Sequence, residues 1–495
     1  MRVLKTIAFF PFLLALFFCV HGSLENYGFI DLREVLWIGL MILICIVVGY
    51  LLLYLFTRDH ISAALIVFFI GTWYLFFGAI HDWVKSHAFL FFLSRYSVFL
   101  PVLLLLTVAW IFFIKRKKKL RPKLFFYLNV LLLIYCGIDG GLLGYKYVTD
   151  KKQAPAMTVD IDTARVKAKP NVYYLLFDEY PGYESLKGSF GYSNDSLYDF
   201  FRRNEFEVLP TFSNYDYTVF SMSSILNMQY VLANYDPHIL YQWDFQNRTN
   251  EIRDGIVFNL FKKMGYQLRN YSIFDIGDQR SVSGQNSFLP VYSQLLTDKI
   301  LHNRIMRTTG WFLENEKFPI PFFKKRYIYQ HDINNKFSLK KVLESAADKN
   351  AVPRFCYAHF LMPHGPFYQD SLGRATPEPV ADDDYTWTKP YFLSYLKYTN
   401  TVIRDLISGI LQNDPGSIIV LMSDHGYHAP GEGKTSTPFN FDNICAVRFP
   451  DKRYLPIKGK LGTVNFFRYL FNCEFGQNMT YLPDSTVLLY HMPHK

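Results

Sequence analysis

Long apolar runs in the first 147 residues constrain the fold more than any other feature of the sequence. Five runs occur there, at about 6–20, 35–56, 61–80, 96–114 and 124–144. The last four approach the length of about 20 residues that a helix needs to cross a bilayer core. We therefore predict a transmembrane region of about five helices over residues 1–147. The first run is shorter and follows the basic sequence MRVLK, so residues 1–22 are either a retained helix or a cleaved signal peptide.

The charge distribution orients this region in a membrane. The net charge is +10, and residues 1–150 carry 14 Lys and Arg against seven Asp and Glu. The loop 115–123, KRKKKLRPK, has seven positive charges and no negative one, which places it in the cytoplasm. Run five then crosses outward, so we predict a multi-pass protein of the plasma or inner membrane with an extracytoplasmic (periplasmic or extracellular) C-terminal domain. Basic charge concentrated at membrane flanks does not indicate nucleic-acid binding.

One carboxylate, Asp139, falls inside the fifth run. An ionisable side chain within a membrane span is a candidate functional group. The alternative is that Asp139 lies near the outer interface, where water solvates it and it has no function.

The remainder of the chain reads as a polar linker, residues 148–170, followed by a soluble domain, residues 171–495. Short apolar runs rich in aromatic and β-branched residues predict buried strands at 172–177, 355–359 and 418–422. Helical patterns at 195–204, 251–264, 338–347 and 390–412 lie between them. This alternation predicts an α/β domain whose mainly parallel central sheet has helices on both faces.

Polar side chains with metal-binding chemistry follow the predicted strands. Asp178, His359 and the pair Asp424–His425 all fall at or next to strand ends. In parallel sheets the ligand site lies at the carboxyl ends of the strands, and carboxylate oxygen with imidazole nitrogen suits a divalent metal. A single Asp-His pair is more often a capping carboxylate beside a surface histidine. Three such strand ends together predict a metal site.

A hydroxyl nucleophile is expected in the stretch 213–230. Apolar residues at helical spacing begin at Val219, so Thr218 falls at or near a helix N-terminus, which favours negative charge. A hydroxyl there that also binds a metal can lose its proton near neutral pH. Thr218 could instead be a simple N-cap. Rival hydroxyls lie deeper in the predicted helix, at Ser221, Ser223 and Ser224.

The order of these motifs resembles the sulfatase-type branch of the alkaline phosphatase superfamily. The motifs are NVYYLLFD, NYDYTVFSMSSILN, HFLMPHGPF and LMSDHG. The similarity is greatest to bacterial membrane-anchored sulfatase-like proteins related to lipoteichoic acid synthase and the phosphoethanolamine transferases. Those enzymes also have five transmembrane helices before an external catalytic domain.

The resemblance implies a role for each matched residue. One divalent metal (zinc, manganese, magnesium or calcium) is bound by four of them: Asp178, Thr218, Asp424 and His425. Thr218 is also the nucleophile. The remaining matched residues, Asn214, His359 and His364, contact the substrate or leaving group, and the two histidines are also expected to act in catalysis.

The chain departs from the sulfatases proper in its cysteines. Their Cys-x-Pro-x-Arg motif, whose Cys becomes formylglycine, does not occur among the six cysteines here. A formylglycine sulfatase is therefore not expected. The cysteine spacing fits neither a zinc ribbon nor a disulfide framework, so the thiols are interpreted as small buried apolar groups.

Three functions remain open at this stage. The first is a transferase that moves a phospho-head-group, of the phosphoethanolamine or phosphoglycerol type, from a membrane lipid to an envelope glycan or lipid through a covalent threonine intermediate. The second is a phosphate or sulfate ester hydrolase that uses the same metal. The third is a non-catalytic binding or polysaccharide-assembly protein on a degenerate fold. After the metal motif, His428 and the segment APGEGKTS are expected to form a surface loop.

Overall fold

The computed structural model describes residues 2–149, 159–231, 240, 242–285, 293–305, 329–380, 385–428 and 438–489. The chain divides into two compact units. One comprises residues 1–156 and 289–323, and the other comprises residues 157–288 and 324–495. We call them the membrane unit and the catalytic unit, after the roles expected from the sequence.

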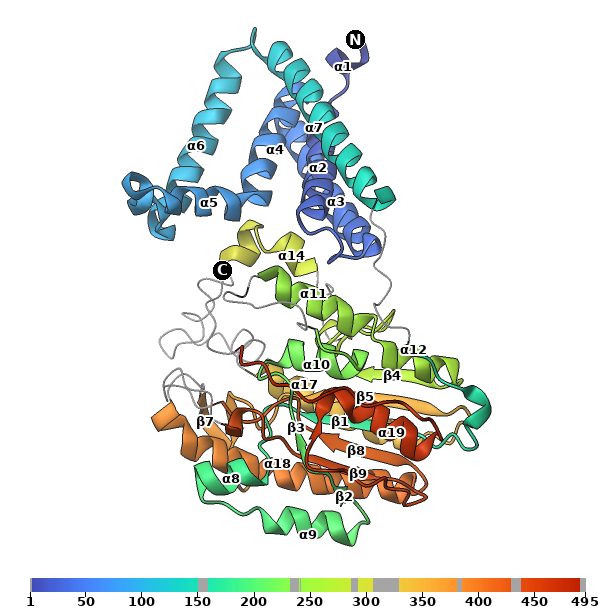
Figure 1. Ribbon diagram of the computed structural model, residues 1–495. Coiled ribbons are helices and arrows are strands. Elements are labelled where there is room, and N and C mark those ends of the chain that lie inside the picture. Colours follow the sequence, from blue (N-terminus) through green and yellow to red (C-terminus); the bar gives the residue numbers. More distant parts are fainter. Residues whose placement is uncertain are drawn as a thin grey trace. The chain divides into compact units, whose positions relative to one another are not determined.

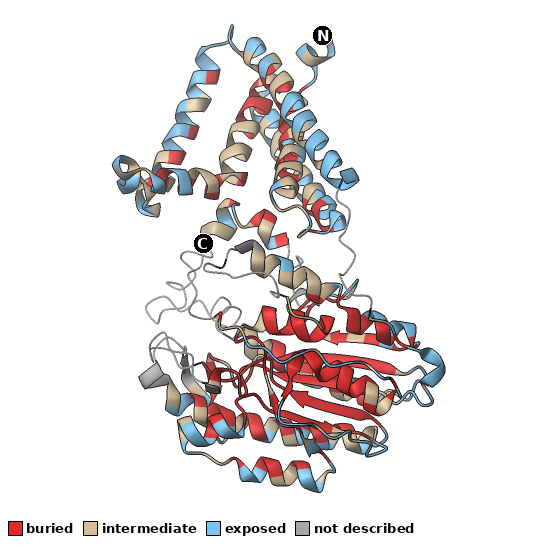
Figure 2. Ribbon diagram, viewed as in Figure 1, coloured by how far each residue is buried: buried red, intermediate tan, exposed pale blue. Residues whose placement is uncertain are grey.

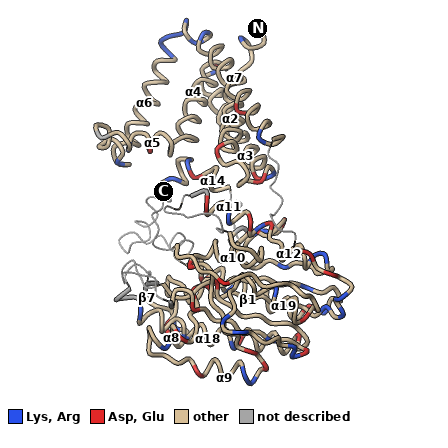
Figure 3. Tube along the Cα trace, viewed as in Figure 1, with Lys and Arg blue, Asp and Glu red and all other residues tan. Residues whose placement is uncertain are grey.

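The membrane unit is helical throughout its described part (Figure 1). Its helices carry few charges along their length, and Lys and Arg gather at the turn between α6 and α7 (Figure 3). The elements are α1 (Arg2–Thr6), α2 (Phe10–Glu25), α3 (Leu32–Thr57), α4 (His60–Leu75), α5 (Phe77–Ser86), η1 (Ala88–Ser94), α6 (Tyr96–Arg116), α7 (Arg121–Thr149) and α14 (Ser293–Thr297).

Three of these helices, α3, α6 and α7, are long and apolar enough to cross a membrane. The expected span 61–80 is broken near Phe76, where α4 and α5 meet at a bend of 61°. Counting that bent pair as one span gives four, and α2 is a shorter apolar helix. The sequence pattern located the apolar segments but did not show that one of them is bent.

Helix α2, which corresponds to the first apolar run, packs inside the membrane unit. Phe10 and Leu14 are among its buried side chains. The fully buried Asn129 of α7 accepts hydrogen bonds from the backbone N–H groups of Phe9 and Phe10, at 2.9 and 2.8 Å. Its amide nitrogen donates to the carbonyls of Leu4 and Ile7. All four hydrogen-bonding positions of this amide are therefore satisfied, as a buried polar group requires.

An ion pair identifies one end of the membrane unit. Asp59, the N-cap of α4, pairs with Arg121 at the start of α7, with 2.6 Å between Oδ2 and Nη1. The loops 57–60 and 115–123 therefore lie at the same end. This is the end that the positive-inside rule assigns to the cytoplasm.

A segment far along the sequence also belongs to the membrane unit. Residues 293–305 pack there through Leu296 and Ile300, which lie in one apolar cluster with residues of α2, α3 and α4. Close approach needs glycine at Gly78, whose N–H donates to the Lys299 carbonyl at 2.7 Å, because a Cβ there would lie 2.8 Å from the Lys299 Cα. The compact units therefore divide the chain differently from the expected boundary, which placed all of residues 171–495 in one domain.

The catalytic unit is built on a six-stranded sheet with strand order β2-β9-β8-β1-β5-β4. The strands β1, β4, β5 and β8 are parallel, whereas β9 is antiparallel to β8 and β2 is antiparallel to β9. The mainly parallel α/β prediction is confirmed. The strands of this sheet are β1 (Val172–Phe177), β2 (Glu207–Val208), β4 (Gln267–Tyr271), β5 (Arg354–Phe360), β8 (Ile418–Met422) and β9 (Cys445–Arg448).

Both faces of this sheet are buried under helices, as Figure 2 shows. Strand β1 illustrates the arrangement, because its six residues are all buried and alternate between two apolar cores. Tyr174 lies in the core that includes residues of α10 (Thr218–Asn227), α12 (Ile256–Lys263) and α19 (Phe466–Glu474). Leu175 lies in the core that includes residues of α9 (Asp195–Arg203), α17 (Gln330–Ala347) and α18 (Tyr385–Asn413). A strand buried on both faces is a continuous apolar run, which is why the sequence revealed it.

Most of the predicted helices are present, with one interruption. The expected helix 251–264 is split at Asp254–Gly255, and a Cβ at Gly255 would lie 3.1 Å from the carbonyl oxygen of Ile252. The helices are α8 (Tyr183–Phe190), α9 (Asp195–Arg203), α10 (Thr218–Asn227), α11 (Gln242–Arg253), α12 (Ile256–Lys263), α13 (Val282–Gln285), α17 (Gln330–Ala347), α18 (Tyr385–Asn413) and α19 (Phe466–Glu474), with short η2 (Thr163–Arg165), η3 (Pro438–Asn440) and η4 (Thr463–Asn465). Two small sheets pair β3 (Thr211–Phe212) with β10 (Leu461–Gly462), and β6 (Phe367–Gln369) with β7 (Ala375–Val380).

Part of the expected linker packs on the catalytic unit. Ile161 is buried in the core that contains α12 and α19. The N–H of Asp162 donates to Gln477 Oε1 at 2.9 Å. Residues 150–158 of the linker lie outside the described residues.

Candidate metal and active site

Neighbouring parallel strands bring the predicted metal ligands together. Asp178 follows β1 directly, and Asp424 and His425 follow β8, which pairs with β1 in register. Each of the three offers one ligand atom, and these atoms lie within 4.8 Å of one another. Donor atoms on one cation at about 2.0–2.6 Å lie at most about 5 Å apart, so one cation fits between them.

The turn after β8 is held in a tightly packed conformation. The Ser423 hydroxyl donates to the His425 carbonyl and accepts the N–H of Tyr180, both at 2.8 Å. Gly426 approaches other backbone so closely that a Cβ would lie 2.2 Å from the Phe439 carbonyl oxygen. Any side chain at Gly426 would therefore push the preceding ligand residues out of place.

The donor atoms of this cluster are those of a cation site. Asp178 Oδ1 and Asp424 Oδ2 are buried and have no hydrogen-bond partner among the described residues. Nδ1 of His425 donates to the Gly426 carbonyl at 2.8 Å, so Nε2 is the nitrogen that faces the cluster, 3.2 Å from Asp424 Oδ2. Two buried carboxylate oxygens without hydrogen-bond donors are costly in a protein interior. The residues present therefore fit a divalent cation.

His359 contacts one of the candidate ligands, Asp178. Its side chain is completely buried, and Nε2 lies 3.3 Å from Asp178 Oδ2. On its other side, Nδ1 lies 3.4 Å from the hydroxyl of Tyr357. His359 is therefore placed to position Asp178. Its expected catalytic and substrate-binding role stays a prediction.

Thr218 is the first residue of α10, as the apolar spacing predicted. Its side chain is half-buried, and Oγ1 lies 3.3 Å from His425 Nε2. The hydroxyl therefore contacts the imidazole nitrogen that faces the metal-ligand cluster. It also lies at a helix N-terminus, where backbone N–H groups favour negative charge.

The rival serines of α10 are already engaged. Ser221 Oγ donates to the Asp424 carbonyl at 2.6 Å, and Ser224 Oγ donates to the Gln229 carbonyl at 2.8 Å. Ser223 donates to a carboxylate oxygen of Glu251. All three are buried, so Thr218 is the hydroxyl of this helix that faces the metal-ligand cluster.

The site also contains two residues, Glu179 and His428, that the sequence analysis did not identify as functional. Glu179 is buried, and its backbone is in the left-handed region at φ 59°, which is strained for a residue with a Cβ. Its carboxylate accepts the N–H of His428 at 2.9 Å and lies 3.9 Å from His364 Nε2. The His428 ring stacks on His425 with 4.4 Å between centroids. The acidic pair Asp178–Glu179 was the available signal, and only its first member was used.

His428 differs from the expected surface loop. His428 is buried at the site rather than exposed. Residues 429–437 lie outside the described residues. His364, by contrast, has a side chain that is 42% exposed, and its Nδ1 lies 2.6 Å from the Gly365 carbonyl, which directs Nε2 toward Glu179.

The electrostatics of the cluster favour ionised carboxylates. Burial raises the pKa of Asp178, but the hydrogen bond with His359 and the charges of neighbouring histidines outweigh it and lower this pKa below its usual range. Burial acts to lower the pKa of His425, yet surrounding carboxylates, Asp424 foremost, raise it. The pKa of His428 falls well below its usual value because of burial and the adjacent His425. His428 is therefore neutral at pH 7.

Asn214 is hydrogen-bonded to other parts of the chain, and its expected substrate-binding role stays a prediction. Its amide nitrogen donates to the Ser485 carbonyl at 2.7 Å and to the Tyr230 hydroxyl at 3.2 Å. Its Oδ1 accepts the N–H of Val464 at 2.7 Å and the hydroxyl of Thr463 at 3.3 Å. With all four positions used, this amide connects chain segments and has no free donor for a substrate.

The cysteines are all free thiols. Cys19, Cys356, Cys445 and Cys473 are buried, as the sequence predicted. Cys45, on α3, is exposed and differs from that prediction.

Solved structures with low sequence identity resemble the chain. The C-terminal periplasmic domain of EptC from Escherichia coli, in complex with Zn, is 14% identical and covers 62% of this chain and 83% of its own, with a TM-score of 0.39. The same domain of the phosphoethanolamine transferase EptC from Campylobacter jejuni is 13% identical, covers 64% and 92%, and scores 0.35. A phosphonate monoester hydrolase from Silicibacter pomeroyi is 12% identical, covers 64% and 75%, and scores 0.40. Scores this low carry no argument about function.

A family model gives the firmer result. No curated protein matches the chain. The model described as Sulfatase matches residues 210–443, a stretch that includes Thr218, Asp424 and His425. Over residues 210–443 the chain therefore matches a catalytic domain of the sulfatase family, in the alkaline phosphatase superfamily.

Proposed function

We propose that this enzyme transfers a phospho-head-group, of the phosphoethanolamine or phosphoglycerol type, from a membrane lipid to an envelope glycan or lipid. The observation that carries the proposal is the position of Thr218 Oγ1, at the start of α10 and 3.3 Å from His425 Nε2. A hydroxyl held beside a residue of the metal-ligand cluster is placed to act as a nucleophile. The resemblance of the sequence motifs to membrane-anchored transferases supports the same reaction.

The charge pattern supports a site outside the cytoplasm. The basic loop 115–123 and the start of α4 lie at one end of the membrane unit, joined by the pair Asp59–Arg121. If that end is cytoplasmic, α7 ends on the outer side, and the catalytic unit follows it in the chain. A lipid donor and an envelope acceptor are both available there.

The metal would be held by Asp178, Asp424 and His425, with Thr218 adjacent. A divalent cation such as zinc or manganese would supply positive charge that stabilises an alkoxide at neutral pH. The residues themselves hold the hydroxyl and keep its surroundings largely dry. His359 would position Asp178, and the hydrogen bond from Ser423 to the His425 carbonyl would position His425.

In the first half-reaction, Thr218 loses its proton to water and its oxygen attacks the phosphorus of the lipid head group. A bond from Thr218 Oγ1 to phosphorus forms, and the bond from phosphorus to the lipid oxygen breaks. Protonated His364 gives its proton to that leaving oxygen. The buried carboxylate of Glu179, 3.9 Å from Nε2, stabilises the imidazolium form of His364 before this transfer.

In the second half-reaction, neutral His364 takes the proton of an acceptor hydroxyl. The acceptor oxygen attacks phosphorus, and Thr218 leaves. A sugar hydroxyl as acceptor gives transfer, and water as acceptor gives hydrolysis. The ligand set is the same for both, so the acceptor decides between these two functions.

The test is intact-mass analysis of the purified full chain after incubation with vesicles of phosphatidylethanolamine or phosphatidylglycerol. We expect an adduct on Thr218 whose mass identifies the transferred group. Thr218→Ala should form no adduct and lose more than about 10⁴-fold in turnover, with unchanged metal content and melting temperature. Turnover by Thr218→Ala at the wild-type rate would exclude the covalent step. Product that forms equally well without an added glycan or lipid acceptor would favour hydrolysis.

A further inference from the structure

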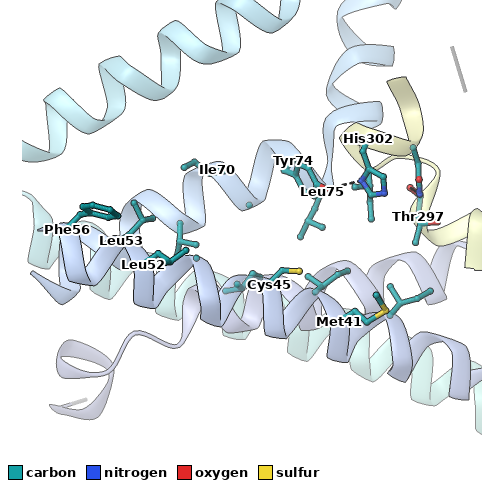
Figure 4. Close-up of a pocket in the computed structure, with 18 residues that line it drawn as sticks. Met41, Cys45, Leu52, Leu53, Phe56, Ile70, Tyr74, Leu75, Thr297 and His302 are labelled. Carbon is teal, nitrogen blue, oxygen red and sulfur yellow. Dashed lines mark hydrogen bonds between the residues drawn. The ribbon is translucent and has the colours of Figure 1, made fainter. Parts of the chain in front are cut away.

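A long apolar cavity lies within the membrane unit (Figure 4). It has a volume of ≈ 540 Å³ and runs along α3 and α4, from Ile38 to Phe56 on the former and from Val67 to Leu75 on the latter. Thr297, Ile300, His302 and Asn303 close one end. Among the described residues that line it, none is acidic, and His302 is the only basic side chain.

The dimensions of this cavity match a lipid chain. Eighteen residues separate Ile38 from Phe56, which at 1.5 Å per residue is about 27 Å of helix. The hydrocarbon core of a bilayer is about 30 Å thick. Leu52 and Phe56, toward the far end, are 51% and 85% exposed, so the cavity is open to its surroundings there. A groove of this length and composition offers water no partners and offers an acyl chain continuous apolar contact.

The closed end of the groove is polar. Tyr74 lies 2.8 Å from Nδ1 of His302, the contact marked by a dashed line in Figure 4. Burial lowers the pKa of His302, so the ring is neutral at pH 7. With Nδ1 accepting from the Tyr74 hydroxyl, Nε2 carries the hydrogen and can donate it to a phosphate oxygen.

Positive charge lies next to this end. Lys299 belongs to the same segment as His302, and its Nζ lies 3.3 Å from Glu25 with both side chains 47% exposed. Such an exposed pair contributes little, so the ammonium group can also approach a phosphate. Lys299 does not itself line the groove, and no carboxylate lies among the described residues that do. The end of the groove therefore complements an anionic head group.

The polar end is a fixed part of the membrane unit. Its segment is held against α5 by the hydrogen bond from Gly78 to Lys299 and against α2 by Leu296, which leaves no room for a Cβ at Gly22. It lies at the α3 N-terminus, opposite the Asp59–Arg121 pair, and is thus on the side assigned to the outer leaflet. In sequence, this segment stands between α13 and α17 of the catalytic unit.

We propose that this groove binds a glycerophospholipid, with one acyl chain along α3 and α4 and the phosphate near His302. The further step, that the bound phospholipid is the donor in the reaction, rests on the proposed function. Binding itself does not depend on Thr218, so the two can be tested apart.

Cys45 provides a way to fill the groove without disturbing the core. It lines the groove and is exposed, and its neighbour Ile44 is 52% exposed but does not line the groove. Cys45→Trp should therefore obstruct the acyl chain. Ile44→Trp is the matched control, because it adds the same ring to the same helix outside the groove.

The experiment is native mass spectrometry of the full chain released from nanodiscs of dioleoylphosphatidylethanolamine or of dioleoylphosphatidylglycerol. We expect wild-type protein, Ile44→Trp and Thr218→Ala to retain one phospholipid. Cys45→Trp should retain it about tenfold less, which corresponds to about 1.4 kcal/mol. His302→Leu should abolish the preference for either phospholipid over dioleoylglycerol, which has no phosphate. Retention by Cys45→Trp equal to that of Ile44→Trp would overturn the proposal.

The same experiment separates the groove from the reaction. Phospholipid retained by wild-type protein, with no adduct ever formed on Thr218, would refute the proposed function and leave the groove. An adduct formed by Cys45→Trp at the wild-type rate, with retention unchanged, would refute the groove and leave the reaction.

Discussion

Two carboxylates in the catalytic unit share an unusual property but lie in opposite surroundings. Asp178 at the end of β1 and Glu474 at the end of α19 each have a buried oxygen without a hydrogen-bond partner among the described residues. Around Asp178 stand histidines, and its pKa is lowered despite burial. Around Glu474, burial and the charge of Asp451 raise the pKa to about 7.

The difference shows what identifies a ligand. A buried oxygen without a partner is costly in either place, and Glu474 reduces that cost by holding a proton. Asp178 instead stays ionised, because its neighbours favour the charged form of the carboxyl group. A bound cation can then serve as the missing partner of its buried oxygen. Asn129 of the membrane unit is a third case, since its buried amide is fully hydrogen-bonded and calls for no ligand.

The largest effect that tests this comparison concerns two histidines of the site. His364→Gln should lower kcat by about 10²–10⁴-fold, because it removes the proposed proton donor, and should leave metal content unchanged. His359→Gln should instead weaken metal binding about 10–100-fold, because Asp178 loses its positioning partner.

Steady-state kinetics and metal analysis of both variants check this division of roles. At saturating metal, His359→Gln should recover most of its activity and His364→Gln should not. If metal restores both variants equally, His364 is not an acid in the reaction.

A second prediction compares the carboxylates directly. A divalent cation that binds the folded protein at 100 times its Kd should stabilise it by about 2.7 kcal/mol. Asp178→Asn should lose this stabilisation, whereas Glu474→Gln should keep it in full. Thermal melts of metal-free protein with added zinc or manganese give the measurement. An equal loss in both variants would mean that the cation binds elsewhere.

The sequence predicted the positions of the candidate site residues where its signals were local. The runs ending at Asp178 and at Asp424 are apolar because β1 and β8 are buried on both faces, and their polar ends must then lie at one edge of the sheet. Thr218 was found for a similar reason, since helical spacing places it at the start of α10.

The contacts that the sequence missed depend on segments far apart in the chain. Glu179 meets His428 across 249 residues, and no local pattern encodes that contact. Residues 293–305 join the membrane unit through close packing at Gly22 and Gly78. Nothing in the local sequence distinguishes these two glycines from others. The position of His359 at a strand end is visible in the sequence, but its complete burial is not.

The smallest expected effect concerns the pH dependence of stability that Glu474 causes. Its pKa is raised from the ordinary 4.5 to about 7, first by burial and then by Asp451. Between these two values the folded protein holds a proton that the unfolded chain has released, so stability falls as the pH rises. Glu474→Gln removes this penalty. It should stabilise the protein at pH 8 by about 1 kcal/mol, a figure reduced from the full shift because the side chain is half-buried and partly screened, and should change nothing at pH 4. Urea unfolding at both pH values measures the difference, and a gain at pH 4 equal to that at pH 8 would mean that packing, rather than the charge of Glu474, causes it.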